Sequence, residues 1–172
     1  MADPLYRMLD AVGPGAHALA TQMLGNRDDA ADAVQDALRS VLERGGSYDP
    51  GRGPYSAWFL AIVRDRCIDL LRSRGFRREV ALEDDAPDWR GPPDSEPESA
   101  LAQSELKGRL KAAISSLAPE HREIVILRDY LGLTYAEIGE VVGVPQGTVM
   151  SRLHRARLAL LERLKDDAHD NL

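Results

Sequence analysis

Several residue types and motifs are scarce in this chain of 172 residues, and each scarcity excludes a class of protein. The single cysteine, Cys67, excludes an intramolecular disulfide and a zinc site built on a cysteine cluster. Aromatic residues make up only 5%, and strand-like alternation is lacking, so we expect an all-α fold. The sequence has no glycine-rich phosphate loop, metal-ligand cluster or nucleophile–base motif. We therefore expect neither an enzyme nor a bound cofactor or metal.

Long hydrophobic segments are lacking as well. No run approaches the roughly 20 apolar residues that cross a bilayer. The N-terminal sequence also lacks the basic and then apolar order that is typical of a signal peptide. We therefore expect a soluble, cytoplasmic protein that does not insert directly into a membrane.

The chain also lacks an overall excess of basic residues. The net charge is −6, and such a balance usually argues against binding to nucleic acid. The acidity is local, because residues 79–105 hold nine acidic residues, one arginine and four prolines, whereas the segments on either side each carry +1. A polar, proline-rich segment with charges of one sign is typical of an extended linker. We predict two small helical domains, 1–78 and 106–172, joined by this flexible acidic linker.

Helical periodicity predicts the elements of both domains. Asn26 is a good N-cap for a first long helix, and a second long helix is expected from about Tyr55 to Ser73. Residues 4–12 and 15–24 are weaker helical candidates before them. Four more helical segments are expected from about residue 100 to 164. The apolar stripe of the first long helix is predicted at Val34, Leu38, Val41 and Leu42.

Basic side chains gather in two of these segments. Residues 52–78 hold seven arginines against two aspartates, and residues 146–165 hold five basic residues against one glutamate. Basic residues along a helix can neutralise phosphates and release counterions, so we favour contact with nucleic acid. The alternative is that both segments are ordinary solvated helix faces.

The strongest local signal is the stretch from Thr134 to Arg157, which has the spacing of a helix-turn-helix. Thr134 and Glu137 form a capping box for a short helix, and Gly143 suits the left-handed turn that ends it. Gly139 is small where the two helices must cross closely. The second helix then presents polar and basic side chains from its N-terminal half, the part that enters a DNA major groove. We favour DNA binding over the alternative, an ordinary helical hairpin.

Three stretches together resemble the extracytoplasmic function (group 4) sigma factors of bacterial RNA polymerase, and the resemblance extends over roughly residues 16–164. The C-terminal stretch LAPEHREIVILRDYLGLTYAEIGEVVGVPQGTVMSRLHRAR resembles region 4, which binds the −35 promoter element. The stretch DDAADAVQDALRSVLE resembles region 2.2, which docks on the largest polymerase subunit. The stretch SAWFLAIVRDRCIDLLRSRGFRR resembles regions 2.3 and 2.4, which melt and read the −10 element. Two such domains in this order, with a linker between them, are a specific signature.

The resemblance assigns roles to residues of the first domain. Four residues on one side of the first long helix would hold the polymerase clamp: Asp32, Gln35, Asp36 and Arg39. The loop from Tyr48 to Ser56 would capture an unstacked −10 base, in a pocket formed by Arg52, Tyr55, Ser56 and Asp65. Trp58 is expected in the core rather than in that stack. The DNA backbone would be contacted from among Arg64, Arg66, Arg72, Arg74, Arg77 and Arg78.

In the second domain, the resemblance places the −35 readers at Met150, Ser151, His154 and Arg155. Gln146 and Thr148 also face outward, and Arg152 and Arg157 suit the DNA backbone. Many relatives carry Lys or Arg where Met150 stands. A methionine cannot donate to guanine O6 or N7 but can touch a thymine methyl, which alters the expected base preference and not the binding. Arg155 retains the option of a bidentate contact with guanine.

The resemblance also implies the partners. The chain would bind core RNA polymerase and promoter DNA, initiate transcription of a specific set of genes, and be held inactive by an anti-sigma factor. The acidic linker would thread the active-site cleft and RNA exit path, where its charge could imitate RNA; a solubilising spacer is the alternative. Two other functions stay open at this point. They are a sigma mimic that binds an anti-sigma factor without DNA, and a free-standing helix-turn-helix repressor.

Overall fold

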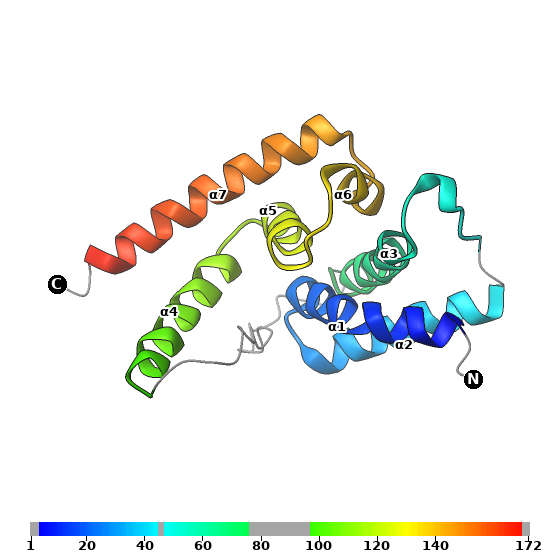
Figure 1. The fold of residues 1–172 in the computed structure, drawn as a ribbon, viewed down its shortest axis with the longest axis horizontal. Coiled ribbons are helices and arrows are strands. Elements are labelled where there is room, and N and C mark those ends of the chain that lie inside the picture. Colours follow the sequence, from blue (N-terminus) through cyan, green and yellow to red (C-terminus); the bar gives the residue numbers. More distant parts are fainter. Residues whose placement is uncertain (1–3, 45–46, 76–96, 170–172) are drawn as a thin grey trace.

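The computed structural model describes residues 4–44, 47–75 and 97–169, and within these ranges it contains helices and no strand (Figure 1). The all-α prediction is therefore confirmed for the described part of the chain. A first group consists of α1 (Pro4–Leu24), α2 (Arg27–Arg44), a 3-10 turn (Pro50–Arg52) and α3 (Tyr55–Gly75). A second group consists of α4 (Pro97–Ser115), α5 (Pro119–Val125), a π-helical turn (Ile126–Tyr130), α6 (Tyr135–Val142) and α7 (Gln146–His169).

Two predicted features fall wholly or partly outside these ranges. Arg77, Arg78 and most of the predicted linker are not described. The C-terminal end of that linker is helical, because α4 begins at Pro97.

Helix α1 differs from the sequence-based expectation of two separate segments. It is one helix with Pro14 in its interior. A proline there removes one backbone hydrogen bond and usually kinks or breaks a helix. The C-terminal half of α1 nevertheless buries Ala16, Leu19 and Ala20 against α2 and α3. This packing offsets the local preference for a break, as tertiary contacts commonly do.

Small side chains bring the first three helices close together. Alanines of α2, including Ala33 and Ala37, are fully buried, and Phe59, Val63 and Cys67 of α3 pack into the same core. The predicted cap at the start of α2 is confirmed, since Asn26 Oδ1 accepts a hydrogen bond from the backbone N–H of Asp29 at 3.0 Å.

The apolar face of α2 is narrower than predicted. Val34 and Val41 are buried, but the side of the helix that carries Leu42 points away from the core, and Leu42 is 51% exposed. Its place in the predicted apolar stripe was therefore wrong.

The helix-turn-helix has the predicted local geometry. Thr134 Oγ1 accepts from the N–H of Glu137 at 3.2 Å, and Glu137 Oε2 accepts from the N–H of Thr134 at 2.6 Å. Gly143 adopts φ 70°, a left-handed conformation that strains any residue with a Cβ. A Cβ on Gly139 would lie 2.9 Å from the carbonyl oxygen of Val144, so the close crossing requires glycine. All three predictions are confirmed.

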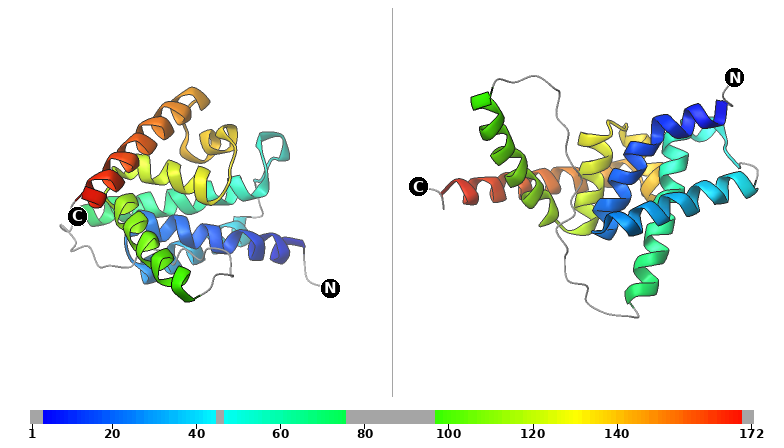
Figure 2. Two further views of the ribbon diagram at one scale, coloured as in Figure 1. Left: turned by 60° about the vertical axis from the view of Figure 1, so that its left-hand side comes forward. Right: turned by 90° about the horizontal axis from the view of Figure 1, so that it is seen from below.

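The two groups of helices share one continuous hydrophobic core. The buried cluster runs from α1, α2 and α3 into α5, the π-helical turn, α6 and α7. Helix α6 packs on α3, and α5 packs on α1, so both views in Figure 2 show the two groups side by side. Arg64 of α3 therefore pairs with an acidic residue of the second group, Glu123 of α5.

Candidate polymerase and nucleic-acid interfaces

One side of α2 is open to solvent. Asp32, Gln35, Asp36 and Arg39, the residues predicted to bind the polymerase clamp, are all exposed. Arg39 donates to Asp36 at 3.2 Å, and because both side chains are more than half exposed, this pair adds little stability. Leu42 lies three residues after Arg39 and adds an exposed apolar side chain. Sequence analysis missed this residue, although its spacing from Arg39 places it on the charged face.

Two adjoining pockets lie between α3 and the segment that runs from the end of α2 into the following loop, and α6 lines one of them. One, of about 390 Å³, is lined by Asp49, Arg52 and Glu140 among others, and the other, of about 330 Å³, by Ser40, Arg66 and Asp69 among others. Trp58, Ile62 and Asp65 line both pockets. The predicted pocket residues Arg52 and Asp65 are thus brought together, whereas Ser56 lines neither pocket.

The aromatic side chains at this site are arranged differently from the prediction. Tyr55 is only 8% exposed and packs against Tyr48, Trp58 and Phe59, with ring centroids 5.3, 5.1 and 6.5 Å away. Its hydroxyl has no hydrogen-bond partner among the described residues, and burial raises the pKa of Tyr55. In this conformation the Tyr55 ring is closed to a base. Trp58 is half-buried: it packs against the hydrophobic core, as expected, and it also lines both pockets.

Four of the predicted DNA-binding arginines of the first group are paired with carboxylates of the same chain, and the longest of these pairs joins Arg66 Nη1 to Asp69 Oδ2 at 3.9 Å. Arg52 Nη2 lies 3.1 Å from Glu140 Oε2, and Arg74 Nη2 lies 2.5 Å from Asp29 Oδ1. The hydrogen bond to Asp29 is the main reason why the pKa of Arg74 is raised. Arg64 pairs with Glu123 and is described next. Arg72, in contrast, is exposed and forms no ion pair with another described residue.

The ion pair between Arg64 and Glu123 is the most buried one described. Arg64 Nε and Nη2 donate to the two carboxylate oxygens, and the side chains are 19% and 7% exposed. Desolvation raises the pKa of Glu123, and the bond to Arg64 opposes this shift. Cys67 is buried as well. Its own burial, together with the nearby negative charge of Glu123, raises the pKa of the Cys67 thiol to about 12, so the thiol stays protonated and unreactive.

The predicted −35 readers share one open face of α7. Gln146, Met150, Ser151, His154 and Arg155 are exposed, and Thr148 and Arg152 are partly exposed. Met150 is 51% exposed. Arg155 forms no ion pair with another described residue, so its guanidinium group is available to a ligand. The buried residues Val149 and Leu153 on the opposite side hold the helix in place.

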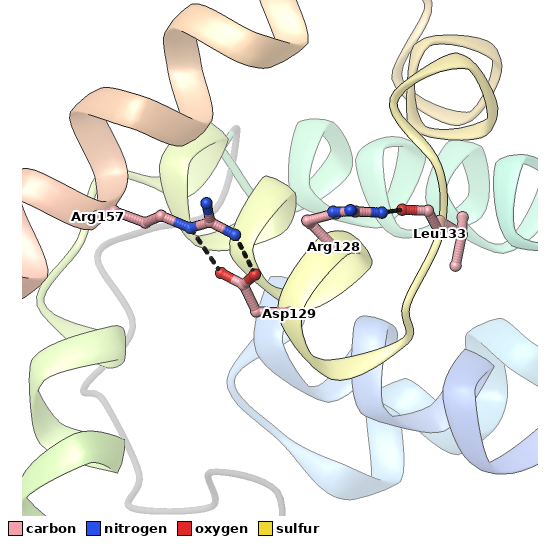
Figure 3. Close-up of polar contacts among 4 residues, drawn as sticks. All are labelled: Arg128, Asp129, Leu133 and Arg157. Atoms are coloured by element: carbon pink, nitrogen blue, oxygen red, sulfur yellow. Dashed lines mark hydrogen bonds and ion pairs between the residues drawn. The ribbon is translucent and has the colours of Figure 1, made fainter.

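Arg157 differs from the other α7 candidates because it is held by an acidic residue. Its Nε and Nη2 donate to the two Asp129 carboxylate oxygens at 3.2 and 2.5 Å (Figure 3). These hydrogen bonds are the main reason why the pKa of Arg157 is raised. In the same turn, Arg128 donates to the Leu133 carbonyl at 2.7 Å and lies 4.8 Å from the Tyr135 ring centroid. Asp129 thus joins the π-helical turn to α7, and Arg128 joins it to the start of α6. This structural contact of Arg157 was not predicted from the sequence.

Comparisons with known proteins match both groups of helices. Residues 8–77 match the family model for Sigma-70 region 2, and residues 107–160 match the model for Sigma-70, region 4. The ECF RNA polymerase sigma factor EcfG of Rhodopseudomonas palustris is 30% identical over 171 residues, which cover 99% of this chain and 91% of EcfG. The chain belongs to the ECF sigma factors of bacterial RNA polymerase.

Two further relatives place this sigma factor in the family. The ECF RNA polymerase sigma factor SigE of Mycolicibacterium smegmatis is 39% identical over 85% of the chain, which spans only 56% of that relative's length. A solved structure of the sigma factor RpoE in complex with the anti-sigma factor NepR, from Bartonella quintana, superposes with a TM-score of 0.72. It is 27% identical, and the match covers 95% of this sigma factor and 98% of RpoE.

The described part of this sigma factor has neither a membrane-spanning helix nor a cluster of metal-ligating side chains. None of the described helices is both long and apolar enough to cross a membrane. Among the same residues, no three His, Cys, Asp or Glu side chains are grouped so that they could hold a metal ion. The arrangement that is present, namely an open α2 face, a pocket beside α3 and an open α7 face, is one suited to binding macromolecules.

Proposed function

We propose that this sigma factor is the promoter-specificity subunit of RNA polymerase and catalyses no reaction itself. The α2 face formed by Asp32, Gln35, Asp36 and Arg39 binds core polymerase, and Leu42 adds an apolar contact there. The observation that most supports the proposal is the open N-terminal half of α7. It is presented by a capped helix and a glycine turn, as recognition of a major groove requires.

Residues of α7 supply the proposed −35 contacts. Arg155 reads a guanine through a bidentate contact, and Met150 contacts a thymine methyl. Gln146, Thr148, Ser151 and His154 lie on the same face and complete it, while Arg152 contacts the DNA backbone. Arg157 remains paired with Asp129, so we propose that it positions α7. A contact with a DNA phosphate would be its second role.

The pocket beside α3 supplies the proposed −10 contacts. A flipped base needs a stacking surface and polar groups at its edge. Trp58 offers the stacking surface, and Asp65 and Arg52 offer the polar groups. Arg64 and Arg72 lie further along α3, where they suit the backbone of the non-template strand. Tyr55 supports Trp58 from beneath, and Ser56 precedes it on the first turn of α3.

Transcription with core polymerase tests the proposal. Purified chain and core enzyme are added to a library of genomic fragments from the source organism, and run-off transcripts are sequenced. We expect transcripts that begin downstream of a shared pair of −35 and −10 sequences, and no transcripts from core enzyme alone. A sigma mimic would yield none. A repressor would instead bind its operator tightly and specifically without polymerase, whereas we expect the chain alone to bind weakly.

An anti-sigma factor is the proposed regulator. The similar Bartonella RpoE was solved in complex with the anti-sigma factor NepR. A protein of this class would inhibit by covering surfaces that polymerase or DNA needs, such as the α2 face around Asp36 and Leu42. Adding a purified anti-sigma candidate to the run-off reaction should abolish transcription. Transcription that continues at saturating amounts would reject that candidate.

A further inference from the structure

A third cavity, of about 350 Å³, lies where α1, α3 and α5 meet, and it shares no lining residue with the two pockets described above. Its walls are mostly apolar and include Met23, Ile68, Leu71 and Pro119. Leu71 and Pro119 are exposed, so the cavity is open to solvent on their side. Cavities of this size between domains, with apolar walls and a few polar groups, are typical binding sites for small molecules.

The first polar group at this cavity is the side-chain amide of Gln22, near the end of α1. Gln22 is only 5% exposed and lines the cavity. Its backbone carbonyl accepts a hydrogen bond from Arg122, but its side-chain amide bonds to no other described residue. A buried amide without a partner costs free energy, so a ligand that bonds to it gains what the folded chain leaves unsatisfied.

The second polar group is the guanidinium group of Arg122, which is half-buried. Its Nη1 and Nη2 donate to the carbonyl oxygens of Gln22, Ser115 and Leu117 at 3.2, 2.6 and 3.1 Å. Its Nε is buried and has no partner among the described residues. None of the described carboxylates forms an ion pair with it, and burial lowers the pKa of Arg122. The cation is thus removed from water without a counterion.

The acidic residues at the cavity do not supply that counterion. Glu123 is held by Arg64 through two hydrogen bonds. Glu120 is exposed, so water and salt screen its charge. Arg64 and Arg122 against Glu123 therefore leave an uncompensated positive charge beside the apolar walls. A carboxylate would compensate this charge, whereas a second cation would add to it.

We propose that this cavity binds a small carboxylic acid with an apolar chain, such as a medium-chain fatty acid. The chain packs against Met23, Ile68 and Leu71, and the carboxylate accepts a hydrogen bond from the Gln22 amide close to Arg122. This site goes beyond the proposed function, because nothing in promoter recognition requires such a ligand. Helices of both regions line the cavity, so the bound acid favours the arrangement of the two regions seen in this structure.

The first test varies the head group of the ligand. Isothermal titration calorimetry of the full chain compares octanoate, 1-octanol and octyltrimethylammonium, which share one chain length. We expect octanoate to bind at a single site with a submillimolar Kd and to raise the Tm with its concentration. The alcohol should bind at least about tenfold more weakly, because it lacks the charge-assisted contact, and the cation should not bind. Equal binding of octanoate and 1-octanol, or no binding of octanoate, would overturn the inference.

The second test removes the unpartnered amide. Gln22→Leu retains a similar volume and should weaken octanoate binding by at least about tenfold. It should not lower the Tm of the ligand-free chain, since the amide that it removes has no partner; a merely structural role of Gln22 would lower it. Gln35→Leu, at an exposed site on α2, is the matched control and should bind octanoate like the unchanged chain.

The third test places a negative charge at the mouth of the cavity. Leu71→Glu should abolish octanoate binding by repulsion and by loss of the apolar wall, whereas Leu42→Glu, the same change at an exposed leucine on α2, should not. Both leucines are exposed, so both variants should fold. Equal octanoate affinity of Leu71→Glu and Leu42→Glu would overturn the inference. Run-off transcription needs no octanoate, so this failure stays distinct from failure of the proposed function.

Discussion

The two regions of this sigma factor present arginine to their surroundings in different ways. In region 2, Arg52 and Arg64 are held by carboxylates of region 4, and Arg74 by Asp29. In region 4, Arg155 extends from α7 without an ion-pair partner among the described residues. The proposed −35 surface on α7 therefore holds an unpaired guanidinium group, whereas two arginines of the proposed −10 surface are already paired with carboxylates. A stripe of arginines in a sequence does not by itself establish an open DNA-binding surface.

The largest expected effect comes from the buried pair. Arg64→Met leaves the Glu123 carboxylate buried without its cation and should lower the free energy of unfolding by about 3–5 kcal/mol near pH 7. Arg72→Met, on the same helix but exposed and unpaired, should change it by less than about 0.5 kcal/mol. Urea denaturation of the full chain measures both. Equal effects would show that Glu123 does not depend on Arg64.

The same variant has a predictable pH dependence. Burial already raises the pKa of Glu123 in the folded protein, and losing Arg64 raises it further. The folded state then binds the proton more tightly than the unfolded state. The penalty on Arg64→Met is fully present above the folded-state pKa, and it is relieved as the pH falls through that value toward the unfolded one. Repeating the denaturation at decreasing pH should narrow the difference from the unchanged chain.

The open α7 face should respond in specificity rather than stability. Arg155→Ala should cost about 1–3 kcal/mol of discrimination at one −35 base pair, because a bidentate contact with guanine is lost. Arg163→Ala, further along the same helix, should leave promoter preference unchanged. Competition between promoter variants for the polymerase holoenzyme provides the measurement. If Arg155→Ala left the promoter preference unchanged, Arg155 would not be one of the residues that recognise −35 bases.

A smaller effect is expected where α6 and α7 cross. Gly139→Ala brings a Cβ to 2.9 Å from a backbone oxygen, which cannot move as a flexible side chain would. We expect the free energy of unfolding to fall by about 1–2 kcal/mol, which is the lower part of the range for overpacked cores, and we expect weaker binding to the −35 element. Gly147→Ala is the matched control, since nothing lies within 4 Å of its Cβ position. It should be neutral or slightly stabilising, as alanine favours helix. Thermal unfolding of both variants tests the contrast.

The smallest effect should come from the exposed pair on the region 4 side. Asp129→Asn weakens the contact to Arg157, and because both side chains are more than a third exposed, we expect a loss below about 1 kcal/mol. Asp166→Asn, an exposed site on α7, serves as its control. If the pair positions α7, Asp129→Asn should also weaken −35 duplex binding slightly while Asp166→Asn does not. A loss of several kcal/mol would mean that the pair does more than join two elements.

Local features of the fold were predictable because their causes are local. The capping box of Thr134 and Glu137, the left-handed Gly143 and the Asn26 cap each depend on residues a few positions apart. The two helical segments expected at residues 4–12 and 15–24 form one helix, because packing of α1 on α2 and α3 outweighs the hydrogen bond that Pro14 removes. The predicted −35 residues are brought together because they lie on one helix, α7, and their contact with DNA stays a prediction.

The region 2 site was less predictable, and the reason is again physical. Tyr55 and Trp58 lie within one turn of α3 and look alike in sequence. Tyr55 is nevertheless buried among Tyr48, Trp58 and Phe59, whereas Trp58 lines the pockets. Leu42 and Leu71 fit an apolar pattern yet are 51% and 42% exposed, because the width of a core face depends on which helices pack against it. Neither outcome is encoded in spacing alone.

By itself, the sequence determined most of the helices, the caps at Asn26 and Thr134, the helix-turn-helix and the placement of acidity in one segment, since these follow from neighbouring residues and composition. Only the tertiary structure decided which arginines are free. Arg52 and Arg64 meet carboxylates 88 and 59 positions away, and Arg157 meets one 28 positions away. The first two pairs depend on how the two regions pack, and the third depends on how α7 packs on the π-helical turn of its own region. An electrostatic contact across such a distance leaves no periodic signal in the chain.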